Sequence, residues 1–144
     1  METVLFPRAQ RLARAYLLTQ LAERGLSQHV GTKDPDGDMP DQWIRLRMQG
    51  GPKTLYEWRV MIDTYCYATD EVVAEGNANL VHSLMLDVPG VAIAVPDWPE
   101  PFPWVRLARH ISGPTALDSE EDLPNLEVFR IVTTWHVLPI PQRS

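Results

Sequence analysis

The chain has 144 residues, a length typical of one domain, and its apolar fraction of 44% excludes a disordered or fibrous protein. Thirteen Lys and Arg against nineteen Asp and Glu leave a formal net charge of −6, which disfavours tight binding to duplex DNA or an anionic membrane. No apolar run is long enough to span a bilayer and the N-terminus lacks the features of a signal peptide, so we expect synthesis in the cytoplasm.

The first predicted element is an amphipathic helix that starts between Thr3 and Pro7. Gly25 is well suited to end it, because glycine readily adopts the left-handed conformation of a helix C-terminus. Residues 31–41, GTKDPDGDMPD, are expected to form a loop. The apolar stripe of the helix comprises Leu5, Ala9, Leu12, Ala13, Tyr16, Leu17 and Leu21.

Two strands follow, over residues 43–48 and 56–67, and the glycine-rich turn between them predicts an antiparallel hairpin. In the first strand, Ile44, Leu46 and Met48 alternate with Trp43, Arg45 and Arg47. In the second, the face opposite Cys66 carries Arg59, Met61, Asp63, Tyr65 and Tyr67, a mixed set that indicates partial solvation. Cys66 is the single cysteine, which excludes an internal disulfide and a cysteine-based zinc site, and we expect it to be a buried, inert thiol.

A second helix is predicted over residues 70–86, with Asp70 and Glu71 favouring its N-terminus. The position of Gly76 within the apolar stripe suggests a close approach of the helix to the sheet. The predicted buried stripe comprises Val72, Val73, Gly76, Leu80, Val81 and Leu84.

Two more strands are predicted, over residues 104–111 and 126–138, after a proline-rich segment at 91–103 that is unsuited to a central strand. A long acidic connection separates the two strands. Together the elements predict one α+β domain over residues 1–144, with an extended tail at 139–144. Its core would be a mostly antiparallel sheet of about four strands, with two helices packed on one face.

Candidate chemistry is sparse. Asp34, Asp36 and Asp38 superficially resemble a calcium loop, but Met39 and Arg45 occupy the positions that require glycine and glutamate. The histidines lack metal-ligand spacing, although those at 110 and 136 lie on the last two strands and could become neighbours across a hairpin. No nucleophile elbow or phosphate-binding loop is present. We therefore expect no catalytic site, no bound metal and no cofactor.

The aromatic residues have two interpretations. Trp98, Phe102 and Trp104 stand within seven residues of a proline-stiffened segment, and Trp43 and Trp58 lie on or near the first hairpin. They are either buried within the monomer or anchor a contact between subunits. The two edges of a short sheet lead to the same suggestion, since pairing with a neighbouring subunit would satisfy their backbone groups.

Several stretches resemble the tail terminator proteins of long-tailed, non-contractile (siphovirus-type) bacteriophages, especially those of actinobacterial hosts. They are PDQWIRLRMQGG at 40–51, YEWRVMIDTYCYATDEVVAEGNANLV at 56–81, WVRLARHISGP at 104–114 and EVFRIVTTWHVLP at 127–139. The shared pattern is an arginine-bearing strand that ends in a glycine pair, a strand that leads through an acidic cap into a helix, and two late strands. The segments 96–103 and 117–122 have no counterpart in it.

The resemblance implies a virion structural protein at the junction of tail and head, assembled in the host cytoplasm. A homohexameric ring would cap the tail tube, end its polymerisation and offer a surface to the head-tail connector protein. Its partners would be copies of itself, the major tail tube protein and the connector, with DNA passing through without specific binding. Asp118, Glu120, Glu121 and Asp122 would line the channel, although a run of this kind is more often a solvated loop.

The arginines Arg45, Arg47, Arg106 and Arg109 would either pair with acidic groups of a neighbouring subunit or simply solvate the open sheet face. With the aromatic residues Trp43, Trp98, Phe102 and Trp104 they form the predicted interface. Two alternatives stay open. One is another head-tail connector or completion protein, and the other is a small α+β enzyme or ligand-binding domain with a pocket under the second helix.

Overall fold

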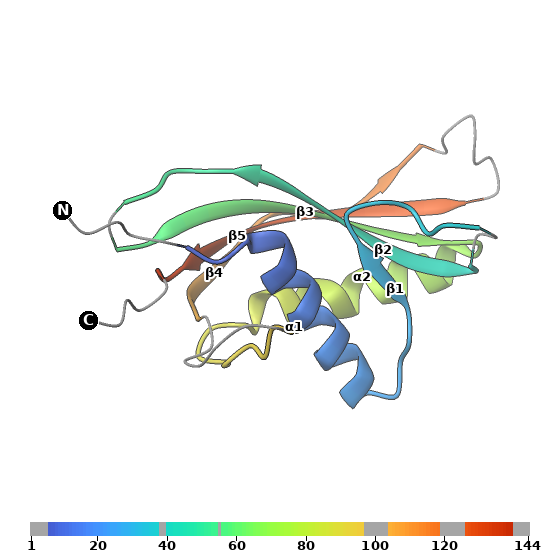
Figure 1. Cartoon of the computed structure of the whole chain (residues 1–144). Helices are drawn as coiled ribbons and strands as arrows, with labels where there is room; N and C mark the ends of the chain where they lie inside the picture. Colours follow the sequence, from blue (N-terminus) through green and yellow to red (C-terminus); the bar gives the residue numbers. More distant parts are fainter. Residues whose placement is uncertain (1–5, 38–39, 55, 97–103, 119–125, 140–144) are drawn as a thin grey trace.

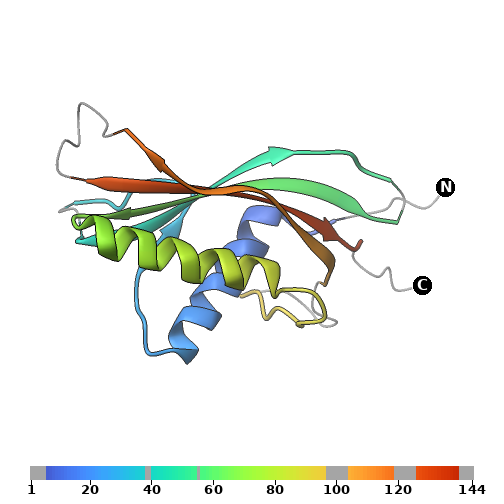
Figure 2. The ribbon, with the colours of Figure 1, turned by 180° about the vertical axis from the view of Figure 1, so that it is seen from behind.

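The computed structural model describes residues 6–37, 40–54, 56–96, 104–118 and 126–139. Within these ranges, five strands form one mixed sheet, and two helices pack against one of its faces (Figure 1). Seen from behind, both helices again lie on the same side of the sheet (Figure 2). In chain order the elements are α1 (Ala9–Glu23), β1 (His29–Gly31), β2 (Gln42–Gly50), β3 (Trp58–Ala68), α2 (Glu71–Leu86), β4 (Val105–Leu117) and β5 (Glu127–Val137).

The strand order is β1-β2-β3-β5-β4, so the last strand of the chain inserts between β3 and β4. The predicted hairpin is confirmed, since β2 and β3 pair antiparallel with Ile44 opposite Cys66. The pairs β3–β5 and β4–β5 are also antiparallel. The expected four strands become five because β1 pairs in parallel with β2. Its three residues, within and beside the predicted loop, are too few to show an alternating pattern.

Helix α1 begins at Ala9, two residues after the predicted range, with Pro7 before it and Arg8 as its N-cap. Its C-terminus is formed as expected. Gly25 has a φ of 71°, its N–H donates to the carbonyl of Ala22, and the next N–H donates to the carbonyl of Leu21. These two bonds make a Schellman motif, which satisfies carbonyls that the helix itself leaves free.

Helix α2 begins as predicted, because the carboxylate of Asp70 accepts hydrogen bonds from the backbone N–H groups of Val72 and Val73. Its predicted buried stripe is wrong in the first half. Val72 is 79% exposed, and a Cβ added at Gly76 would contact nothing within 4 Å, so Gly76 faces away from the sheet and is not a point of close approach. The buried face comprises Ala74, Ala78, Val81, Leu84 and Met85. The small alanines, rather than the valines, allow the first turns to rest on the sheet.

The core lies between the two helices and the covered face of the sheet. Trp135 of β5 is fully buried, packs edge-on against Tyr16 with ring centroids 5.7 Å apart, and donates from Nε1 to the carbonyl of Met85. The hydroxyl of Tyr16 donates to the carbonyl of Leu84 at 2.5 Å. Cys66 is buried as expected, and this burial raises the pKa of its thiol to about 12, which keeps the thiol protonated and unreactive.

Candidate interaction surface

The second face of the sheet is covered by neither helix (Figures 1 and 2). We call it the open face. The register places on it the side chains of alternate residues: Trp43, Arg45 and Arg47 of β2, Arg59, Met61, Asp63, Tyr65 and Tyr67 of β3, Leu107, Arg109, Ser112, Thr115 and Leu117 of β4, and Val128, Arg130, Val132, Thr134 and His136 of β5. Arg106 joins them at the irregularity between Val105 and Leu107. Arginines and aromatic rings therefore share one surface.

Asp63 lies at the centre of the open face, yet it is only 1% exposed. Nη2 of Arg130 on β5 donates to both of its carboxylate oxygens at 3.1 Å, and the amide of Gln49 on β2 donates to one of them. A buried carboxylate requires such partners, because an unpaired charge is strongly disfavoured away from water. This cluster ties together three neighbouring strands.

Glu57 forms a second ionic cluster just before β3. Its carboxylate lies 3.1 Å from Nε of Arg59 and 2.8 Å from Nη2 of Arg106, and Nδ1 of His136 lies 3.2 Å away. The hydrogen bond from Arg106, followed by that from Arg59, lowers the pKa of the Glu57 carboxyl to about 2 against the opposing effect of burial. Arg106 thus has an acidic partner within its own chain.

The aromatic rings of the open face are covered by one another and by an arginine side chain. Trp43 and Tyr67 are buried and stack with ring centroids 4.7 Å apart and an interplanar angle of 6°. The guanidinium of Arg45 lies over the ring of Tyr65 at 4.8 Å and over that of Tyr67 at 5.7 Å. Leu126 and Val128 complete this small apolar cluster. The mixed face predicted for β3 is therefore only partly solvated, as expected.

The predicted interface residues fall into three groups, and Arg45 and Arg106 belong with those that contact side chains of their own chain. Arg47 and Arg109 are exposed and have no carboxylate partner among the described residues. Trp104, immediately before β4, is 43% exposed, whereas Trp43 is packed inside its own chain. Trp98 and Phe102 lie outside the described residues.

Of the predicted channel residues, Asp118 is exposed directly after β4. Glu120, Glu121 and Asp122 lie outside the described residues.

The suggested pairing of two histidines across the last hairpin is wrong. His110 is opposite Thr133 and lies on the helix side of the sheet, where its Nδ1 is 2.8 Å from Nε2 of His82 on α2. His136 lies on the open face. Burial and the neighbouring His110 lower the pKa of His82. Among the described residues there is no group of three potential metal-ligating side chains.

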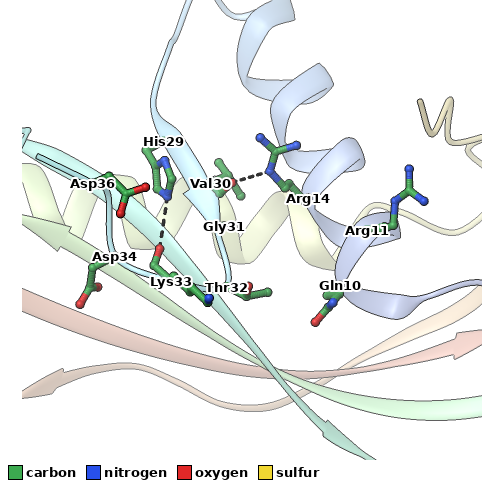
Figure 3. A pocket seen from close by; sticks show the side chains of 10 residues that line it. All are labelled: Gln10, Arg11, Arg14, His29, Val30, Gly31, Thr32, Lys33, Asp34 and Asp36. Atoms are coloured by element: carbon green, nitrogen blue, oxygen red, sulfur yellow. Dashed lines mark hydrogen bonds between the residues drawn. The ribbon is translucent and has the colours of Figure 1, made fainter. Parts of the chain in front are cut away.

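A pocket of about 300 Å³ lies between α1 and the segment that starts at β1 (Figure 3). Arg11, Arg14, His29 and Lys33 line it together with the acidic residues Asp34 and Asp36. Arg14 is already engaged, since its Nε donates to the carbonyl of Val30 at 2.7 Å. The pocket is lined by no residue of α2 and holds no nucleophile paired with a base, so it differs from the pocket considered for an enzyme or ligand-binding domain.

The sheet edges are short or irregular. β1 covers one edge over only three residues, and beyond Arg45 that edge is formed by β2, whose register shifts between Met48 and Gly50. β4 forms the other edge over thirteen residues, but its register shifts three times, between Val105 and Leu107, between His110 and Ser112, and between Ser112 and Thr115. Irregular edges are poor templates for another strand. The open face is thus the better candidate for an interaction surface.

Sequence reasoning missed Arg130 and the central role of the two carboxylates, Asp63 and Glu57. Asp63 was placed on the correct face, but only the pairing of β3 with β5 shows that Arg130 reaches it. The two residues are 67 positions apart, and no local pattern predicts which distant strand becomes the neighbour.

Among the described residues, no helix has both the length and the apolar character needed to cross a membrane.

Comparison with known proteins gives little. No family model matches the chain. No curated protein matches it. A solved structure described as the virion of a native gene transfer agent (GTA) particle contains a chain that matches with a TM-score of 0.44 and 16% identity, over 90% of each chain. At this TM-score and identity, the likeness supports no inference about function.

Proposed function

We propose that this protein is a virion structural protein of a siphovirus-type bacteriophage, a tail terminator whose subunits form a homohexameric ring. The ring caps the tail tube, ends its polymerisation and presents a surface to the head-tail connector protein. The protein performs no catalysis and uses no cofactor. Its support begins with the resemblance of residues 40–51, 56–81, 104–114 and 127–139 to that family.

One structural observation carries the proposal. The open face combines buried aromatic rings with arginines, and Arg45, Arg47 and Arg109 have no carboxylate partner among the described residues. Arginines without an acidic partner on an uncovered sheet face favour a protein contact, because arginine is enriched at subunit interfaces. DNA would pass through the ring without specific binding, in keeping with the net charge of −6.

The test is self-assembly. Native mass spectrometry and negative-stain electron microscopy of the purified chain should show a six-subunit species and rings with six-fold symmetry, at high protein concentration if not at low. Added to purified tail tube protein, the rings should shorten the tubes and bind at one end. A chain that stays monomeric at millimolar concentration and leaves tube growth unchanged would refute the proposal.

The second candidate is another head-tail connector or completion protein. The same open face favours it, since a connector also binds through protein surfaces. A ring that forms but does not alter tube growth, and that binds purified heads instead, would identify this alternative.

A further inference from the structure

Charge is divided unevenly over the molecule. The open face carries six arginines, at positions 45, 47, 59, 106, 109 and 130. Its carboxylates are Asp63, Glu57 and, at the margin, Asp34, which accepts a hydrogen bond from Nε1 of Trp43. The face therefore has a formal excess of three positive charges. Because the whole chain carries −6, the rest of the molecule carries a net charge of −9.

The chemistry of this basic face favours a protein carboxylate over a nucleic acid base as its partner. A single-stranded nucleic acid needs exposed aromatic rings on which bases can stack. Here the rings of Trp43 and Tyr67 are buried against each other, and the guanidinium of Arg45 covers the ring of Tyr65. The accessible groups are guanidiniums, which form bidentate hydrogen bonds with carboxylates.

A matching surface lies on the other side of the molecule, on the first turns of α2. Glu71 and Glu75 are exposed there, one helical turn apart. Beside them Val72 is 79% exposed and Val73 44% exposed. We call these four residues the helix patch. It combines negative charge with apolar side chains, whereas the open face offers positive charge and the aliphatic stems of arginines.

We propose that the open face of one copy of this chain binds the helix patch of the next copy. Arg47 and Arg109, which have no partner within the described chain, pair with Glu71 and Glu75 of the neighbour. The two surfaces lie on opposite sides of the sheet (Figure 2), so each copy can bind two neighbours head to tail. Such a contact closes into a ring when the rotation that relates one copy to the next is a whole fraction of 360°. The inference rests on the self-assembly in the proposed function and names the surfaces responsible.

The experiment uses two charge-reversed variants of the full chain. The face variant carries Arg47→Glu and Arg109→Glu, and the patch variant carries Glu71→Lys and Glu75→Lys. A control, Arg8→Glu with Arg11→Glu, makes the same charge change as the face variant on exposed positions at the start of α1. Sedimentation velocity measures association at low and high salt, and circular dichroism verifies that each variant is folded.

We expect each of the two variants to associate at least about tenfold more weakly than the wild type at low salt. The control should associate like the wild type, and high salt should weaken wild-type association because the pairs are solvent-accessible. Mixing the face and patch variants should restore association, since the reversed face of one now complements the reversed patch of the other. Restoration also excludes misfolding as the cause of the loss.

Several results would overturn the inference. If the wild type forms rings and both variants do so equally well, the named surfaces are wrong while the proposed function stands. The named surfaces are likewise wrong if mixing the face and patch variants does not restore association. A wild type that is monomeric at every salt concentration refutes both. If the face variant assembles normally but loses binding to a double-stranded DNA fragment, the open face is a nucleic acid surface instead.

Discussion

The C-terminus of α2 depends on two aromatic side chains from other elements. The carbonyl of Met85 cannot receive the usual helical N–H four residues later, because that residue is Pro89. It accepts instead from Nε1 of Trp135 at 2.9 Å. Tyr16 donates to the neighbouring carbonyl of Leu84, which also receives a backbone N–H at 3.1 Å. Replacing Trp135 by phenylalanine should therefore destabilise the protein more than replacing Tyr16 by phenylalanine.

The magnitudes follow from what each substitution leaves behind. Trp135→Phe leaves the buried carbonyl of Met85 without a donor, which costs about 2 kcal/mol. The smaller ring also leaves a cavity of roughly 40 Å³, worth about 1 kcal/mol more. Tyr16→Phe removes a hydroxyl from a carbonyl that keeps another donor, so we expect a loss of about 1 kcal/mol. For a chain of this length, a total of about 3 kcal/mol should lower Tm by roughly 10 °C.

Urea unfolding followed by circular dichroism measures both variants against the wild type. The m value should be unchanged, so that the shift in midpoint reports stability alone. Equal losses for Trp135→Phe and Tyr16→Phe would contradict the reasoning, since the Met85 carbonyl would then have no special need of the indole donor. A second measurement uses pH. Burial raises the pKa of Tyr16 to about 12 in the folded state. The protonated hydroxyl therefore stabilises the fold fully below pH 10, and this stabilisation is lost between pH 10 and 12. Tyr16→Phe should reduce this loss.

Three further predictions concern the sheet and its ionic clusters. Gly51→Ala should cost at least about 3 kcal/mol in urea unfolding, because its Cβ would meet a backbone carbonyl of β3 at a φ of 149°. Gly50→Ala, at a φ of 73° in open space, should cost only about 1 kcal/mol, and equal losses would contradict this. Glu57→Gln should cost about 1 kcal/mol at pH 7. The pKa of Glu57 in the folded state is lowered to about 2, so Glu57 stabilises the fold fully above pH 4.5, and this stabilisation is lost as the pH falls towards 2. If Glu57→Gln loses stability with falling pH in the same way as the wild type, this origin of the acid sensitivity is refuted. Arg130→Met should cost about 2 kcal/mol by leaving a buried carboxylate with one donor, whereas Arg47→Met should change thermal unfolding by less than about 0.5 kcal/mol.

Local patterns predicted most of the fold. Alternation in β2 and β3 was strong enough to give their pairing, and Gly25 and Asp70 marked helix ends through conformational preference and capping. The burial of α2 was mispredicted because hydrophobicity alone favoured its valines. The position of the helix axis on the sheet decides which face of α2 is buried. At the contact with the sheet, the small alanines fit better than the valines.

The candidate surface was only partly predictable. The open-face positions of Trp43, Arg45 and Arg47 followed from alternation within a single strand. The arginines that pair with Asp63 and Glu57 from distant strands did not, since Arg130 lies on β5 and Arg106 on β4. Pairing between distant strands depends on the energy of the whole sheet, which no short window of sequence contains.

The three irregularities along β4 and the brevity of β1 have a wider consequence. A chain whose surfaces bind copies of itself can assemble into open-ended fibrils through its sheets. Here the edges of the sheet are short or irregular and favour little extension by hydrogen bonding, so copies that join through the proposed surfaces would do so through side chains, at an angle that the protein surface dictates. Growth governed by such an angle has a natural stopping point once the last copy meets the first.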